Sequence, residues 1–304
     1  MQFHYGGLET LSLDASAVTI GSFDGVHLGH QVLMSQLIET ARQKSLPSVV
    51  VTFFPHPIVV LRGLQHPFYL TLPEEKAGIL RRLGIDYVVT IPFTKSLSEK
   101  TPFEFMSMLH DHLNVRELVI GPDFALGKDR LGNPDTLREI GKTMGYNVEI
   151  VPFRQDQDGR ISSSRIRTSL TTGQIETANA LLGRPYTIPV TLLDAGTSEA
   201  DDGGTTRVEL SCDPMQLLPA AGLYNAFVEQ DTANPFTLFI RSVVDQGKPL
   251  LTGWLSAPIT RSLGVSQPSC LSIVSASDTL PPTLSGIAAN DPILTEINRD
   301  LKGD

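Results

Sequence analysis

The chain has 304 residues, of which 41% are hydrophobic and 19% are charged, and its formal net charge at pH 7 is −9. These values are ordinary for a globular protein, the length suits two domains, and the negative charge argues against general binding to nucleic acid. No apolar run approaches the ~18 residues of a membrane-spanning helix, and no signal-peptide pattern is present. Cys212 and Cys270 lack C-x-x-C spacing, so we expect a cytoplasmic protein without a disulfide framework or zinc site.

The first half of the sequence alternates between apolar strands and amphipathic helices. The predicted strands cover residues 17–20, 48–54, 86–91, 116–121 and 147–153, and the predicted helices cover 28–44, 73–83, 102–113 and 133–145. Most of these strands are apolar throughout, which is typical of parallel strands buried on both faces. We therefore expect an α/β domain with its ligand at the carboxyl ends of the strands.

The turn after the first of these strands has the sequence GSFDGVHLGH, from Gly21 to His30. Its glycines allow a sharp turn and a close approach to a ligand, and the helix that follows offers N–H groups to an anion. His27 and His30 are three residues apart, so both can lie on one face of the first helical turn. The pattern matches neither G-x-G-x-x-G nor G-x-x-x-x-G-K-[ST]. It predicts a phosphate pocket with two imidazoles, and the alternative is that the histidines only cap and pack a turn.

Three later segments carry further candidate site residues. Residues 52–57, TFFPHP, place aromatic side chains and a proline-fixed turn after the second strand, and residues 121–132 form a glycine-punctuated loop after the fourth. Residues 161–167, ISSSRIR, put three hydroxyls before two arginines, a pattern suited to a triphosphate. The simpler alternatives are a proline-rich turn, a solvated loop and a helix N-cap, respectively.

The second half of the sequence predicts short strands with few helices. They cover residues 187–193, 207–212, 222–229, 236–244, 250–255 and 270–274, which favours an antiparallel barrel or sandwich. Residues 291–301 are predicted to form a helix, and residues 198–205 an acidic loop. Trp254, Cys212 and Cys270 are interpreted as core residues.

The H-x-G-H pattern at residues 27–30, separated from F-D-G by one residue, resembles the signature of the nucleotidyltransferase superfamily. Together, the four segments resemble the FMN adenylyltransferase (FAD synthetase) module of the bacterial bifunctional riboflavin kinase/FAD synthetase family, over about the first 186 residues. This resemblance implies a Rossmann-like nucleotidyltransferase domain at 1–184 and a smaller, mostly antiparallel β-barrel domain at 185–304. Ala125 and Leu126 depart from the bulkier or polar pair usual in the third segment, and Ser164 replaces the usual threonine.

The resemblance also implies the reaction and its residues. The chain would transfer AMP from ATP to FMN, giving FAD and pyrophosphate, with Mg²⁺ bound to ATP and no metal-binding side chain. The implied catalytic residues are His27, His30, Ser163 and Arg167. The implied ATP-binding residues are Gly21, Ser22, Phe23, Asp24, Gly29, Ser162 and Ser164, with Asp24 expected to brace the turn. The implied flavin-binding residues are Phe54, His56, Pro57, Asp123 and Phe124.

The barrel of the resembled family is a riboflavin kinase whose P-T-A-N motif serves magnesium and ATP. That motif is absent here, so we expect riboflavin phosphorylation to be lost. Two alternatives stay open: an enzyme of the same fold that acts on another phosphorylated acceptor, and a non-catalytic flavin or nucleotide sensor. Small molecules are the expected partners, without nucleic acid or membrane, and the sequence leaves the oligomeric state undetermined.

Overall fold

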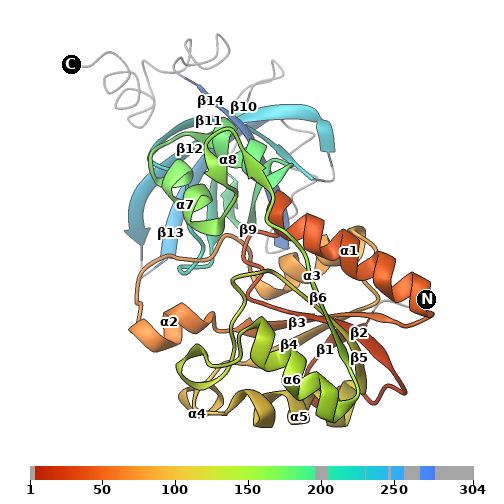
Figure 1. Cartoon of the computed structure of the whole chain (residues 1–304). Coiled ribbons are helices and arrows are strands. Elements are labelled where there is room, and N and C mark those ends of the chain that lie inside the picture. The colour runs from red at the N-terminus through yellow and green to blue at the C-terminus, as the bar shows by residue number, and fades with distance from the viewer. Residues whose placement is uncertain (1–3, 196–204, 230, 246–247, 257–267, 278–304) are drawn as a thin grey trace. The chain divides into compact units, whose positions relative to one another are not determined.

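The computed structural model describes residues 4–195, 205–229, 231–245, 248–256 and 268–277 (Figure 1). The predicted acidic loop, apart from Thr205, and the predicted C-terminal helix lie outside these residues. The chain forms two compact units, one from Met1–Gln65 and Thr71–Ser163 and the other from His66–Leu70 and Ser164–Asp304. The division into domains at 184/185 stays a prediction.

A six-stranded parallel sheet forms the centre of the first unit, in the order β1-β4-β3-β2-β5-β6. Its strands are β1 (His4–Gly6), β2 (Ser16–Ile20), β3 (Ser48–Phe54), β4 (Tyr87–Pro92), β5 (Val115–Ile120) and β6 (Asn147–Ile150). Every pairing is parallel. The predicted α/β class is confirmed, and β1 is a sixth strand that the sequence pattern did not indicate because it has only three residues.

The helices of this unit are α1 (Leu28–Lys44), α2 (Pro57–Arg62), α3 (Pro73–Arg82), α4 (Lys95–Ser98), α5 (Pro102–Leu113) and α6 (Pro134–Met144). Four of them match the predicted helices, and α2 and α4 are short additions. A hairpin follows β6, made of β7 (Gln155–Asp156) and β8 (Gly159–Arg160), and 3-10 turns occur at Leu8–Thr10 and Lys128–Arg130. None of the described helices is long and apolar enough to span a membrane.

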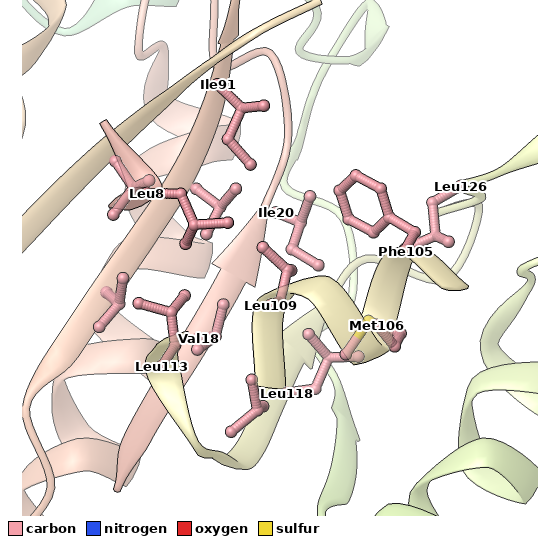
Figure 2. Packing of buried hydrophobic residues seen from close by; sticks show 14 of the residues in the cluster. Leu8, Val18, Ile20, Ile91, Phe105, Met106, Leu109, Leu113, Leu118 and Leu126 are labelled. Carbon is pink, nitrogen blue, oxygen red and sulfur yellow. The ribbon is translucent and has the colours of Figure 1, made fainter. Parts of the chain in front are cut away.

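Two apolar clusters cover the two faces of the sheet. Ala17 belongs to the cluster with Met34 and Leu37 of α1, whereas its neighbour Val18 belongs to the cluster with Leu109 of α5. Figure 2 shows the second cluster, in which α5 packs against the strands, and Figure 1 shows α1 and α3 on the opposite face from α5 and α6. Successive strand residues therefore face different helices, which explains why these strands are apolar throughout.

The second unit contains a closed antiparallel barrel in the order β10-β13-β12-β11-β14-β9. Its strands are β9 (Tyr186–Ala195), β10 (Thr205–Cys212), β11 (Gly222–Val228), β12 (Asp231–Asp245), β13 (Lys248–Ser256) and β14 (Pro268–Ser277), and α7 (Ser163–Thr171) and α8 (Ile175–Leu182) precede it. The predicted barrel is confirmed. Cys212 is buried and Cys270 is half-buried, while the side chain of Trp254 lies outside the described part.

Two helical glycines offer a matched test of the packing. A Cβ on Gly141 would lie 2.4 Å from the Tyr146 carbonyl oxygen, whereas one on Gly78 would meet nothing closer than 4.0 Å. We expect Gly141→Ala to lower the free energy of unfolding by ~1–3 kcal/mol and Gly78→Ala to raise it by ~0.5–1 kcal/mol. Urea unfolding of both variants checks this expectation, and a stabilising Gly141→Ala would contradict the described packing.

Candidate active site

The turn between β2 and α1 has backbone angles that need support from their surroundings. Phe23 and Val26 have φ angles of 46° and 40°, in the left-handed region that a β-branched residue rarely adopts. Both side chains are buried, and the Val26 amide donates to the Phe23 carbonyl oxygen over 3.2 Å. A Cβ on Gly21 would lie 2.8 Å from the Phe23 ring. Strain of this kind persists where contacts fix it, and it clusters at functional sites.

Asp24 links this turn to distant parts of the first unit. Its Oδ1 accepts a hydrogen bond from the Thr71 amide over 3.0 Å, and the Thr71 hydroxyl accepts one from the Gly25 amide over 3.0 Å. Ser163 Oγ donates to the Asp24 carbonyl oxygen over 2.8 Å. Asp24 is 2% exposed, and its carboxyl group is hydrogen-bonded within the protein. Asp24 thus braces the turn, and Ser163 lies directly against it.

His27 and His30 form a stacked pair at the N-terminus of α1. Their ring centroids are 3.6 Å apart with an interplanar angle of 15°, and the His27 Nδ1 atom accepts the His30 amide over 3.2 Å. The edge-to-face contact of Phe23 with His30 spans 5.3 Å between centroids. In the described part of the chain, no hydrogen-bond partner is recorded for the amides of Leu28 and Gly29. The first turn of α1 therefore keeps N–H groups that suit an anion.

The environment of His30 disfavours its cationic form. Burial lowers the pKa of His30 well below its ordinary value, and the charges of His27, Lys76 and Arg160 lower it further. His30 is partly exposed as a residue, but its Nδ1 atom is buried and has no hydrogen-bond partner in the described structure. A buried polar atom without a partner is energetically costly, and such atoms are found more often at functional sites than in ordinary cores.

A cavity of about 270 Å³ opens where the strands of the parallel sheet end. Its walls come from the segments that follow β2, β3, β5 and β6 and from the residues just before α7. It includes many of the site residues predicted from the sequence: Gly21, Ser22, Phe23, Asp24, His27, Gly29, His30, His56, Asp123, Phe124, Ser162 and Ser163. The sheet order changes direction at β2, so this is the edge at which such sheets bind ligands.

Four predicted site residues do not line this cavity. Phe54 ends β3 with 38% of its surface exposed, and Pro57 is the first residue of α2. Ser164 and Arg167 belong to the second unit, where the Arg167 guanidinium donates to the Phe68 carbonyl oxygen over 3.0 Å and lies 3.9 Å from the Phe68 ring centroid. Their roles, like those of the cavity residues, stay predictions.

Two basic residues near the cavity were missed by the sequence interpretation. Arg160 lines the cavity, donates to the Asp123 carboxylate and lies 3.5 Å from the Phe153 ring centroid. Lys76 on α3 donates from Nζ to the Ser22 carbonyl oxygen over 2.7 Å. Arg160 immediately precedes the ISSSRIR segment, so its position in the sequence was an available signal.

The comparison with protein families places these features in a known group. The FAD synthetase family model matches residues 10–165, which include the His27–His30 turn and Ser163. The chain belongs to the FAD synthetase family. The resemblance read from the sequence motifs is therefore confirmed, and the parallel-sheet unit with its cavity is the part of the chain that the family model matches.

Individual relatives agree with this family. The FAD synthetase of Listeria monocytogenes is 31% identical over 211 residues, covering 69% of this chain and 80% of the relative. The bifunctional riboflavin kinase/FMN adenylyltransferase of the same organism is 36% identical over 208 residues, covering 68% of this chain and 66% of the relative. The Escherichia coli bifunctional protein is 34% identical, covering 58% and 56%. The matches thus span two thirds or less of these bifunctional relatives.

The fold of the whole chain also recurs in a solved structure. The crystal structure titled macrolide-efflux protein from Streptococcus pneumoniae has a TM-score of 0.75 with 22% identity, covering 99% of this chain and 98% of the other. At this identity the likeness concerns the fold alone.

We expect His30 to titrate well below the ordinary histidine value of about 6.5. Nuclear magnetic resonance titration of the imidazole signals measures this midpoint directly. Arg160→Gln should raise the midpoint because it removes one nearby positive charge, whereas Arg138→Gln on the exposed side of α6 should leave it unchanged. A wild-type midpoint at or above the ordinary value would contradict the described burial.

Proposed function

We propose that this chain is an FMN adenylyltransferase that transfers AMP from ATP to the phosphate of FMN, giving FAD and pyrophosphate. Its membership of the FAD synthetase family supports the reaction class. The observation that carries the proposal is the meeting of two distant segments around one cavity. Ser163 is hydrogen-bonded to the turn that contains His27 and His30, although 139 residues separate Ser163 from Asp24.

The chemistry joins two anionic groups. An oxygen of the FMN phosphate attacks the α-phosphorus of ATP, and the bond from that phosphorus to the bridging oxygen breaks as pyrophosphate leaves. The attacking oxygen is already ionised, so the reaction needs no strong general base. The barrier comes from bringing negative charges together and from the charge that develops on the leaving group. Positioning and electrostatic stabilisation therefore supply most of the catalysis.

The phosphate side of the cavity is assigned to the turn and to the start of α7. His27, His30 and the α1 amides would contact the phosphates of ATP, and Ser162 would donate a hydroxyl hydrogen bond. Ser163 would contribute its backbone N–H, because its hydroxyl donates to the Asp24 carbonyl oxygen. Arg160 adds positive charge at the same cavity. Together with Ser162 and Ser163, Arg167 is retained as a proposed contact to the β and γ phosphates, and Ser164 is retained as a proposed ATP-binding residue.

The flavin side is assigned to the segments that follow β3 and β5. His56 and Phe124 line the cavity, together with Asp123, whose carboxylate accepts a hydrogen bond from Arg160. The aromatic Phe54 and the helix-starting Pro57 lie within two residues of His56 in the sequence. An isoalloxazine ring suits such aromatic and apolar surroundings.

Magnesium is proposed to enter with ATP as part of the substrate. Among the described residues, no group of three or more histidine, cysteine, aspartate or glutamate side chains is arranged to hold a metal ion. The carboxylate of Asp24 is engaged by Thr71. In this proposal the ion would be bound by phosphate oxygens, as is usual for Mg²⁺ with nucleotides, and no catalytic step is assigned to a protein-bound metal. A cytoplasmic location is proposed together with these soluble substrates.

His30→Ala tests the phosphate assignment. We expect kcat to fall by ~10²–10³-fold with a smaller change in KM, because the lost contact acts mainly in the transition state. Initial rates of pyrophosphate release from ATP and FMN measure the effect. His66→Ala replaces an exposed histidine and should leave the rates near those of the wild type. An unchanged kcat in His30→Ala would overturn the assignment.

The same assay separates the remaining functional alternatives. Pyrophosphate release with pantetheine phosphate, nicotinate mononucleotide or glycerol phosphate in place of FMN would identify another acceptor. Binding of ATP and FMN without pyrophosphate release would identify a sensor. Release that depends on FMN alone among these acceptors is the expected result.

We also propose that the barrel does not phosphorylate riboflavin, since the P-T-A-N motif is absent from the sequence. Incubation of the protein with riboflavin, ATP and magnesium should yield neither FMN nor FAD, as measured by chromatography of the flavins. A parallel incubation with FMN serves as the positive control for an active adenylyltransferase. Formation of FMN or FAD from riboflavin would contradict this proposal, because FMN produced by a kinase would be converted to FAD in the same incubation.

A further inference from the structure

Lys76 is a charged residue placed among apolar neighbours. It lies on α3 with 5% of its surface exposed, on the helix face that also carries Ile79 and Leu80. Burial of an ammonium group is costly unless hydrogen bonds or opposite charges compensate it. An apolar side chain of similar length would fill the same space without this cost. The lysine therefore needs an explanation other than packing.

The contacts of Lys76 are with neutral oxygens. Its Nζ atom donates to the Ser22 carbonyl oxygen over 2.7 Å and to the Thr52 hydroxyl over 3.2 Å. No ion pair of Lys76 is recorded among the described residues, and the nearby Asp24 uses its Oδ1 atom to accept from Thr71. Burial lowers the pKa of Lys76 to about 8, against a smaller opposite effect of Asp24. The protein thus buries a positive charge without a carboxylate in contact with it.

These contacts converge on the turn that forms the cavity. The Thr52 hydroxyl also donates to the Ser22 carbonyl oxygen, over 3.1 Å, so one carbonyl group is held from two sides. Ser22 lines the cavity and directly precedes Phe23, which has a positive φ angle. Thr52 lies in β3, and the Gly21 amide donates to the Val51 carbonyl oxygen over 3.0 Å. Lys76 therefore fastens the turn to the end of the neighbouring strand.

We infer that Lys76 is a positioning residue of the adenylyl-transfer site: its buried ammonium holds the Ser22 carbonyl and supplies positive charge for the phosphate groups of the ligand. This inference rests on the proposed function in so far as the ligand carries phosphate. An anion in the cavity would be attracted by the positive charges of Lys76 and Arg160. The protein would then gain binding energy from a charge that is costly without the ligand.

The charges around this group set the sign of its effects. His30 is influenced by His27 of the same turn, Lys76 of α3 and Arg160 of β8, and Lys76 is influenced by Asp24. Removal of the Lys76 ammonium takes away one of the positive charges that disfavour protonated His30. The pKa of His30 should therefore rise in a variant without this charge, whereas loss of an unrelated contact would leave it unchanged.

The first experiment uses Lys76→Met and the matched control Arg82→Met, which removes a positive charge from the exposed side of the same helix. Titration of the His30 imidazole signals by nuclear magnetic resonance should give a higher midpoint in Lys76→Met and an unchanged midpoint in Arg82→Met. Pyrophosphate, added alone as the probe, should bind to Lys76→Met about tenfold more weakly than to the wild type, the equivalent of one pKa unit of linkage. Unchanged values of both quantities would overturn the inference.

The second experiment separates the charge from the hydrogen bond. Lys76→Gln keeps an N–H donor without the charge, and Lys76→Arg keeps the charge. If the turn is displaced by about 1 Å, kcat/KM for adenylyl transfer should fall by about a hundredfold in Lys76→Met. Lys76→Arg should recover part of this loss and Lys76→Gln less of it. Equal rates for Lys76→Gln and Lys76→Arg would contradict a role for the charge.

A third measurement needs no substitution and applies even if the variants fail to fold. In the wild type, the Lys76 ammonium signal of ¹⁵N-labelled protein should titrate near pH 8 without ligand, and pyrophosphate should move this midpoint to higher pH. A midpoint that pyrophosphate leaves unchanged would overturn the inference. Failure of the acceptor assay with FMN would overturn only the proposed function, because these binding measurements involve no turnover.

Discussion

The arrangement of the site depends on how the protein holds one strained turn. Phe23 and Val26 have left-handed backbone angles, and such angles persist only where neighbouring contacts fix them. Three polar links do this from different parts of the first unit: Thr71 to the Asp24 carboxylate, Ser163 to the Asp24 carbonyl and Lys76 to the Ser22 carbonyl. His27 and His30 lie at the C-terminal end of this turn, so these three hydrogen-bonded contacts also fix the position of the stacked rings.

The parallel sheet explains why distant segments can share one cavity. Strand β2 lies between β3 and β5, and the chain leaves each of these strands at the same edge. The segments that begin at Gly21, His56 and Gly121 therefore lie close together and line one cavity, although they are far apart in the sequence. The helices on the two faces bury the strands in apolar clusters. A site built on such rigid elements can hold its residues in a fixed geometry.

Most of this architecture could be predicted from the sequence, because its helices, strands and site motifs have clear local patterns. Apolar strands alternating with amphipathic helices predicted the α/β unit, and the glycine–histidine turn and the serine-rich segment predicted the two sides of the cavity. Strand β1 was not predicted because three residues are too few to show a pattern of apolar and polar side chains. Its pairing with β4 also depends on contacts distant in sequence. The buried position of Lys76 was not predicted because lysine side chains are usually exposed to solvent. Its spacing of three and four residues from Ile79 and Leu80 nonetheless placed it on the apolar side of α3.

The short segment His66–Leu70 has a consequence for protein engineering. It belongs to the second unit, where the Phe68 and Tyr69 amides donate to the Met215 carbonyl oxygen over 2.8 and 3.0 Å, and the Leu217 amide donates to Tyr69. In a protein truncated before the barrel, this segment would lose its hydrogen-bond partners. The segment directly precedes Thr71, whose amide donates to the Asp24 carboxylate. A change in the β2–α1 turn after such a truncation would therefore be as direct a consequence as the loss of the barrel itself.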